Sequence, residues 1–315
     1  MHRCLTLLAV LSLATAAQAQ TYPDRPITVI VPFAAGSAGD IMARGITEVM
    51  RERLKQTFVV VNRDGAAFTL GTAQAAQARP DGYTLGFTST TALTLQTKLM
   101  KDVPYTADAL VPVCRVYSGN FVMAVKPESP FQTLADVVAA AKASPGKVSY
   151  GVTGVNTPQH IGTMRFERVA GIQLYNITYR GEPQTAPAHK AGEVDLVVVT
   201  PGYAVTQGFR ILGTYAEQRR ADMPEVKTFR EQGFDVVAGS DGGFFVPKGT
   251  PEPIRATLQA ACEEGTNSEV YAKIATATRS LAGFKTGEAF AQQIAAEDKI
   301  FAEMIASGAI KPAAP

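Results

Sequence analysis

The sequence predicts an α/β fold with two lobes. Short runs of β-branched and apolar residues alternate along the chain with segments in which apolar residues recur at helical spacing, and this alternation is typical of layered α/β proteins. A chain of 315 residues exceeds the size at which single hydrophobic cores usually stop growing, which favours two domains. Glycines at residues 119 and 239–243 precede predicted strands and can supply the dihedral freedom that a hinge requires.

The first predicted strand and helix illustrate the pattern. Residues 27–31 form a β-branched run that Pro32 closes. After a short loop, Ile41, Met42, Ile46 and Val49 recur along one helical face, which predicts a helix over residues 40–55. Similar runs predict strands at residues 58–61, 83–88, 121–125, 148–151, 174–178, 194–199 and 244–246. Helical spacing and stop signals predict helices at residues 71–79, 134–143, 158–170 and 183–191, and two or three more between residues 251 and 306.

The N-terminal segment predicts export. Arg3 is followed by an apolar run from Leu5 to Ala14 and by small residues that end at Ala19, the order found in a cleavable signal peptide. The apolar run has roughly half the length needed to span a bilayer, so a retained anchor is the less favoured alternative. Cys4 precedes this run, which argues against a lipoprotein. We therefore predict cleavage after Ala19 and a soluble mature protein in the periplasm.

The charge of the chain excludes some partners. The formal net charge is +2, and it falls to +1 without residues 1–19, because that segment contains Arg3 and no acidic residue. A nearly neutral chain has no electrostatic reason to prefer nucleic acid or an anionic membrane surface. Any anion that binds must therefore be held by local geometry.

The cysteine and histidine pattern predicts no metal site and no cofactor. Cys114 and Cys262 remain after cleavage; they could form a disulfide in an oxidising compartment, although isolated cysteines are more often buried thiols. The chain has no closely spaced cysteine pair, and His160 and His189 have no ligand partners at helical spacing.

Three segments combine a strand, a loop of small residues and a helix start. Ligands of open α/β sheets bind at the carboxyl ends of the strands, where helix N-termini offer free N–H groups to an anion. In the first loop, Phe33 can cover a ligand, and Ala35, Gly36 and Ser37 permit close approach to the backbone. Asp40 fits a helix N-cap better than a ligand contact. A nucleophile elbow around Ser37 is not supported, because Ala35 stands where its first glycine belongs.

The second loop runs from residue 150 to His160 and carries several donors. Thr157 followed by Pro158 predicts a helix start with threonine as the cap. Thr153 and Asn156 add a hydroxyl and an amide beside the exposed N–H groups. His160 falls in the first turn, where the helix dipole disfavours a charged imidazole, which favours a packing or supporting role over a catalytic one.

The third loop contains Arg180 and Gly181 directly after a predicted strand, with Pro183 opening the next helix. A guanidinium at this place could hold a carboxylate through two hydrogen bonds. The alternative is a surface arginine that pairs with Glu182 or with solvent. The remaining candidate ligand-binding residues are Thr88, Ser89, Thr200 and Asp241. No segment combines groups for covalent chemistry, so we predict binding without catalysis.

Taken in order, these motifs resemble the solute receptors of tripartite tricarboxylate transporters, the Bug/TctC family. The resemblance extends from about Tyr22 to the C-terminal helices. The segments that carry it are residues 22–27, 31–40, 61–63, 79–85, 159–160, 179–181, 192–195 and 247–251.

The resemblance implies a Venus-flytrap fold of the type II periplasmic-binding class, with strands that cross a hinge. It implies a monomeric receptor that binds a small carboxylate or dicarboxylate, a carboxylate-bearing amino acid or an aromatic acid, and delivers it to membrane permease subunits. We expect residues 1–19 to be the signal peptide, residues 20–120 and 241–315 to form one domain, and residues 121–240 to form the other.

This chain departs from the family pattern in its loops. In the first loop, Ala35 stands in place of the usual proline, and Gly36-Ser37 in place of the usual Gly-Gly pair. In the second loop, Asn156 stands in place of a usual glycine. Arg180 replaces a lysine, and Asp241 stands near an expected aromatic residue. An aspartate in the cleft would repel an anion or accept a ligand N–H group. Two other functions are alternatives to a transport receptor. One is a sensor component that presents its solute to a membrane kinase, and the other is an enzyme built on the same fold.

Overall fold

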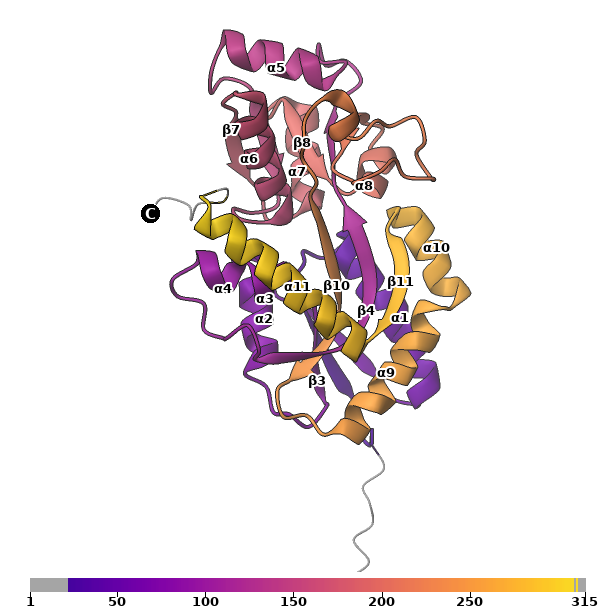
Figure 1. Ribbon diagram of the computed structural model, residues 1–315. Helices are drawn as coiled ribbons and strands as arrows, with labels where there is room; N and C mark the ends of the chain where they lie inside the picture. Colours follow the sequence, from indigo (N-terminus) through magenta and orange to yellow (C-terminus); the bar gives the residue numbers. More distant parts are fainter. Residues whose placement is uncertain (1–21, 309, 311–315) are drawn as a thin grey trace, which may run out of the picture.

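The computed structural model describes residues 22–308 and residue 310. In this part of the chain the strands form a six-stranded sheet in the order β11-β4-β10-β3-β1-β2 and a five-stranded sheet in the order β7-β6-β8-β5-β9. Each sheet is the centre of one lobe, the six-stranded one in the lower half of Figure 1 and the five-stranded one in the upper half. The predicted signal peptide lies outside the described residues.

The lower lobe begins with parallel strands that are covered by helices. Its first elements are β1 (Ile27–Val31), α1 (Ala38–Leu54), β2 (Phe58–Asn62), the 3₁₀ turn η1 (Ala66–Phe68), α2 (Thr69–Ala76), β3 (Thr84–Ser89), α3 (Thr91–Thr94) and α4 (Gln96–Leu99). Strand β1 pairs in parallel with both β2 and β3. Ile27 and Val29 of β1 pack with Met42 and Ile46 of α1 in the buried core, so the helical apolar face predicted from the sequence is the face that covers the sheet.

The upper lobe repeats the alternation of strands and helices. Its elements are β5 (Val122–Val125), α5 (Leu134–Ala143), β6 (Ser149–Val152), α6 (Pro158–Ala170), β7 (Tyr175–Thr178), α7 (Glu182–Ala191), β8 (Leu196–Val199), α8 (Pro201–Thr206), β9 (Arg210–Thr214) and the 3₁₀ turn η2 (Arg230–Gln232). Strand β6 pairs in parallel with β7 and β8, and β5 lies antiparallel between β8 and β9. The carboxyl ends of β6, β7 and β8 therefore place three loops on one side of the sheet.

Two long antiparallel strands connect the lobes. Strand β4 (Leu110–Asn120) pairs with β10 (Gly239–Pro247), with Asn120 opposite Gly239 and Leu110 opposite Pro247. Gly119, Gly239, Gly242 and Gly243 were predicted to lie in hinge loops that precede strands. In the structure they lie inside β4 and β10. Gly243 is required by packing, because a Cβ there would stand 2.0 Å from the carbonyl oxygen of Cys114. We keep the domain boundaries near residues 120 and 240 as a proposal.

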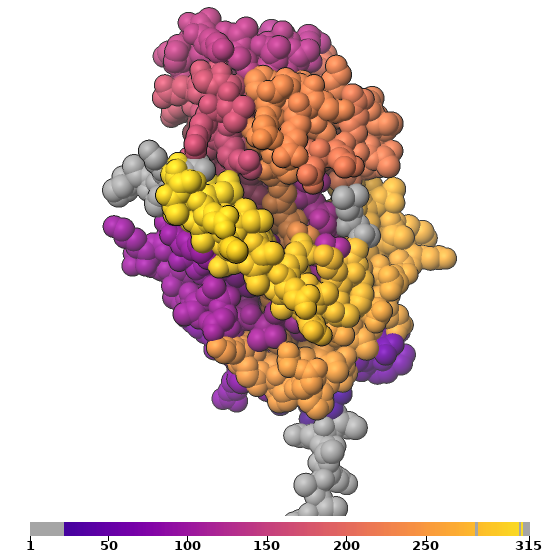
Figure 2. Space-filling view, viewed as in Figure 1, coloured from indigo at the N-terminus to yellow at the C-terminus, as the bar shows by residue number. Residues whose placement is uncertain are grey.

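The C-terminal elements return to the lower lobe and then reach the upper one. They are α9 (Glu252–Thr266), α10 (Glu269–Thr278), β11 (Leu281–Thr286) and α11 (Gly287–Ala306). The sequence predicted two or three helices here and missed β11. Phe301 and Met304 of α11 pack in one cluster with Ile161 of α6, and Figure 2 shows this helix lying across the front of the molecule toward the upper lobe. Among the described residues, no helix combines the length and apolar composition needed to cross a membrane.

A disulfide joins Cys114 of β4 to Cys262 of α9, with a Cα–Cα distance of 6.6 Å. Both residues are fully buried. The sequence analysis favoured free buried thiols for these cysteines over a disulfide, and that prediction is wrong. The bridge ties the crossing strand to a helix of the lower lobe across 148 residues of sequence.

Candidate ligand-binding cleft

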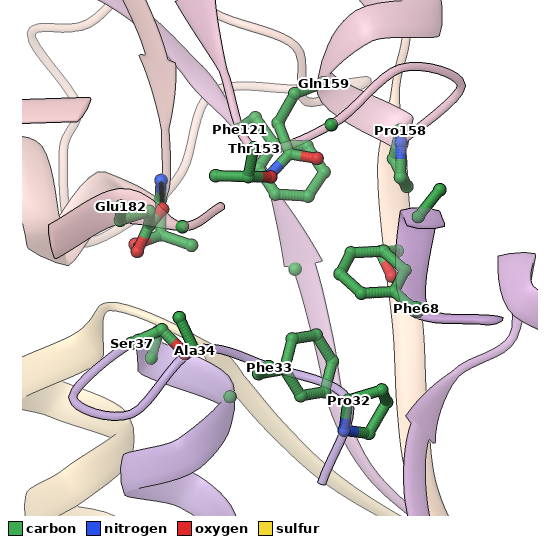
Figure 3. A pocket seen from close by; sticks show the side chains of 18 of the residues that line it. Pro32, Phe33, Ala34, Ser37, Phe68, Phe121, Thr153, Pro158, Gln159 and Glu182 are labelled. Carbon is green, nitrogen blue, oxygen red and sulfur yellow. Dashed lines mark hydrogen bonds between the residues drawn. The ribbon is translucent and has the colours of Figure 1, made fainter. Parts of the chain in front are cut away.

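A cavity of about 650 Å³ lies where the two lobes face each other. The β1–α1 loop and the η1 turn form its lower wall, and the loops after β6, β7 and β8 form its upper wall. In Figure 3, Phe33 lies below the space and Thr153 and Gln159 above it, with Glu182 on one side and Phe68 with Pro158 on the other.

The structure brings together half of the residues predicted from the sequence. Those that line the cavity are Phe33, Ser37, Thr153, Asn156, Arg180, Gly181 and Thr200. Those that do not line it are Ala35, Gly36, Asp40, Thr88, Ser89, Thr157 and Asp241. Whether the first set contacts a ligand stays a prediction.

The β1–α1 loop is held open by Asp40. The Asp40 carboxylate accepts hydrogen bonds from the Gly36 N–H (2.9 Å), Arg44 Nε (2.9 Å) and Asn62 Nδ2 (2.8 Å). Although burial alone would raise the pKa of Asp40, the hydrogen bonds from Arg44, Gly36 and Asn62 and the charge of Arg44 lower it overall. Asp40 was predicted as the helix cap, but Ser37 occupies that position. Asp40 instead stands in the first turn and shapes the loop from behind.

Ser37 caps α1 without using its hydroxyl. Its backbone has the extended conformation of a cap, yet its side chain makes no capping hydrogen bond. Ser37 Oγ is buried and has no hydrogen-bond partner among the described residues. The ring of Phe33 covers the first turn, and this close packing requires Gly39, since a Cβ there would lie 2.6 Å from the ring.

Glu182 places a carboxylate in the wall of the cavity, which the sequence did not predict. The side chain is buried and accepts hydrogen bonds from the Thr200 N–H (2.5 Å) and Thr200 Oγ1 (3.0 Å). Burial raises the pKa of Glu182 to about 7, against the opposing effect of the two hydrogen bonds from Thr200 and of the Ala38 N–H at the start of α1.

The β6–α6 loop is held by its own side chains. Thr157 caps α6: its hydroxyl accepts from the His160 N–H (3.5 Å) and donates to the carbonyl of Gly154 (2.8 Å). Asn156 has a left-handed backbone, with φ of 62°, and its N–H donates to His160 Nδ1 (3.0 Å). Burial lowers the pKa of His160 to about 4, so the ring is neutral and serves as an acceptor. The supporting role predicted for His160 agrees with this geometry.

Asn156 of this loop and Gln159 of the first turn of α6 both line the cavity, and each has a side-chain oxygen without a partner in the described part of the chain. Asn156 Oδ1 and Gln159 Oε1 have no hydrogen-bond partner among the described residues, and each residue is only 5% exposed. Gln159 was not predicted from the sequence as a site residue. Because a terminal amide offers N–H donors at one end and an oxygen at the other, a half-turn lets either group meet a ligand.

The predicted residues on β3 and β10 belong to a different region. Asp241 faces Arg115, at 3.4 Å from Nη1, and accepts from Gln293 Nε2 at 2.6 Å; it lines a smaller cavity of about 310 Å³ between the crossing strands and α11. Ser89 Oγ pairs with Ser240 Oγ at 2.7 Å, and Thr88 with Thr72. The expectation that Asp241 would repel an anion in the main cleft is therefore not supported by its position.

The remaining wall is apolar and locally strained. The rings of Phe33 and Phe68 lie 5.0 Å apart, and Phe121 and Pro158 also line the space. Ala66, Ala67 and Phe68 all have positive φ, of 44°, 49° and 75°, a conformation that costs residues other than glycine roughly 1 kcal/mol or more each. Nothing in the sequence marked this turn. In residues 22–308, no three histidine, cysteine, aspartate or glutamate side chains are grouped to hold a metal ion.

Comparison with known proteins identifies the family. A sequence model described as the tripartite tricarboxylate transporter family receptor matches residues 42–303. The chain belongs to this family. It is 30% identical over 269 residues to the protein BugT of Bordetella pertussis, covering 83% of this chain and 82% of BugT.

Solved structures of similar receptors have the same two-lobed architecture. A structure described as a periplasmic transporter has a TM-score of 0.86 with 28% identity, over 92% of this chain and 99% of that one. MatC from Rhodopseudomonas palustris, solved with bound malate, has a TM-score of 0.83 with 25% identity, over 89% of this chain and 98% of that one. The Venus-flytrap fold implied by the motifs is thereby confirmed.

Proposed function

We propose that the protein is a periplasmic solute receptor that captures a small carboxylate in the cleft and delivers it to membrane permease subunits. The observation that carries the proposal is that three residues lining the cavity, Ser37, Asn156 and Gln159, each have a buried side-chain oxygen without a partner among the described residues. Buried polar groups normally have partners. A ligand that supplies them would remove the cost of their burial.

The two lobes contribute to this set separately. Ser37 comes from the lower lobe, whereas Asn156 and Gln159 come from the upper lobe. A ligand that contacts both groups would stabilise the closed arrangement of the lobes, which is the form a membrane partner can distinguish from the open one. The bound malate of the related MatC supports a carboxylate as the ligand class. Export with cleavage after Ala19, and a monomeric state, are part of the same proposal.

The proposal is tested by ligand-induced stabilisation of the mature chain, residues 20–315. A thermal-shift screen would use aliphatic and aromatic monocarboxylates, dicarboxylates and amino acids. A ligand at about 100 times its Kd stabilises the native state by about 2.7 kcal/mol, which raises Tm measurably. We expect at least one carboxylate to do so, with its Kd then measured by calorimetry.

The variant Gln159→Leu removes the amide from the upper wall. If Gln159 bonds to the carboxylate, its loss should weaken binding by about 1.5 to 3 kcal/mol, which is roughly tenfold to more than a hundredfold. Gln173→Leu is the matched control, because Gln173 is exposed on the same lobe and does not line the cavity. A screen in which no carboxylate raises Tm, or a Gln159→Leu variant that binds as tightly as wild type, would contradict the proposal.

A further inference from the structure

The carboxylate of Glu182 is an unexpected feature in a cleft that is proposed to bind an anion, because it carries the same charge as the ligand. Among the described residues that line the cavity, Glu182 is the one acidic side chain. It is 4% exposed and stands in the first turn of α7. Figure 3 shows it next to Ser37 and Ala34, on the side of the cavity away from Pro158.

Glu182 interacts with groups of both lobes. Thr200 donates twice from the upper lobe, through its N–H and its hydroxyl, and the Ala38 N–H of the lower lobe lies close enough to lower the pKa of the carboxyl. Ala38 is the first residue of α1, and an N–H group at that position is one of the free donors that a helix N-terminus can offer to an anion. In this chain the protein's own carboxylate lies beside that donor.

A ligand carboxylate at this end would meet a like charge and would compete with Glu182 for the Ala38 N–H. Carboxylates that share a site repel each other, and the repulsion is strong where water is excluded. Arg279 does not compensate, because it is engaged with the Asp222 carbonyl at 2.6 Å and the Asp222 carboxylate at 3.7 Å. Arg180 is exposed at the rim, where solvent screens its charge.

We propose, on the basis of the function proposed above, that Glu182 makes this receptor select monocarboxylates over dicarboxylates. The single carboxylate lies at the α6 end, beside Asn156 and Gln159. The other end of the ligand, beside Glu182 and Ser37, carries no negative charge and is apolar or bears a donor such as a hydroxyl or an ammonium group. The unpartnered Ser37 hydroxyl and the Phe33 and Phe68 rings suit such a ligand.

The test uses ligands that differ at one end. Hexanoate, 6-aminohexanoate and adipate share a six-carbon chain and one carboxylate, and butanoate with succinate extends the comparison to shorter chains. Kd is measured by calorimetry at pH 8, because burial raises the pKa of Glu182 to about 7 and the group is then ionised. We expect the wild-type chain to bind each monocarboxylate at least tenfold more tightly than the dicarboxylate of equal length.

The variant Glu182→Gln keeps the shape and removes the charge, so it should reduce this ratio at least tenfold and weaken 6-aminohexanoate relative to hexanoate. Glu225→Gln is the control, because Glu225 is exposed on the same lobe and does not line the cavity. If Glu182→Gln does not fold, the wild-type ratio alone decides the point. Equal binding of mono- and dicarboxylates by wild type, or a ratio unchanged in a folded Glu182→Gln, overturns the inference and leaves the proposed function intact. Binding of no carboxylate overturns both.

Discussion

Two helices, α1 and α6, begin at the cavity after the same kind of loop, but their N-termini are satisfied in different ways. At α6 the loop is self-sufficient: Thr157 caps the helix and His160 accepts the Asn156 N–H. At α1 the cap residue Ser37 makes no side-chain capping bond, and the Glu182 carboxylate of the other lobe lies near the Ala38 N–H. The same construction therefore serves different purposes at the two ends of one cleft.

The difference between the two helix starts distinguishes residues that hold a loop in shape from residues that can bind a ligand. The α6 loop holds its shape without help and leaves the Asn156 and Gln159 amides for a ligand. The α1 loop is held by Asp40 of its own lobe, and a carboxylate of the opposite lobe, Glu182, lies beside its helix start. A change at α6 should alter stability through the cap, whereas a change at Glu182 should alter the dependence of stability on pH.

The largest effect is expected from Glu182→Gln in the pH dependence of unfolding. The pKa of Glu182 is raised from 4.5 to about 7 in the folded state, mainly by burial. The folded state then binds more protons than the unfolded state between these values, so the stability contribution is complete below pH 4.5 and is lost as the pH rises through 7. Relative to the glutamine variant, wild type should lose about 3 kcal/mol of unfolding free energy between pH 4.5 and 8.

Urea unfolding of both proteins across this range measures the difference. His160, with its pKa lowered to about 4 by burial, and Glu297, with its pKa raised to about 7 by burial, titrate in both proteins, and their effects cancel in the comparison. A difference between the two proteins that stays constant with pH would mean that the Glu182 carboxylate is not buried as the structure places it.

A smaller effect on the unfolding free energy is expected when the cap residues of α6 and α1 are replaced and the two variants are compared. Thr157→Val removes the hydroxyl that caps α6 and keeps a similar volume at a site with no exposed surface. Loss of a threonine cap costs about 1 kcal/mol, with a range up to about 2. Ser37→Ala removes a buried hydroxyl that makes no capping bond and has no partner within residues 22–308, so this variant should not lose unfolding free energy. Equal losses in the two variants, measured by urea unfolding, would remove the distinction between the two helix starts.

Local signals predicted the longer helices, but the short helices α3, α4 and α8 were missed. The bounds of α5 and α6 agree with the prediction because Pro158 and Gly171 mark the start and stop of α6 and a capping box at Thr133 starts α5. Strand β11 was missed because its pairing with β4 depends on residues more than 160 positions away, which no local pattern records. Strands β4 and β9 escaped prediction as well.

The site was predicted only in part, because local signals are visible in the sequence whereas contacts between distant segments are not. Ser37, Thr153 and Asn156 lie in loops whose small residues and cap signals are visible in sequence. Glu182 was weighed only as a partner for Arg180, because its actual contacts, Thr200 and Ala38, lie in distant segments. Asp241 was expected near the cleft from the family pattern, but the register of β10 directs it to Arg115 and Gln293.

The smallest effect is expected from Arg180→Ala, which tests whether the rim beside Glu182 takes part in recognition. Arg180 lines the cavity but is exposed, and interactions of exposed charges contribute about 1 kcal/mol or less. The bidentate contact considered from the sequence would instead cost about 1.5 to 3 kcal/mol on removal. We expect less than a fivefold increase in the Kd for the best monocarboxylate at low salt, and a smaller one at high salt, where screening is complete within a few ångströms. A tenfold or larger loss that persists at high salt would show that Arg180 folds over the bound ligand, and recognition of the anion would then belong to the α7 side of the cleft as much as to α6.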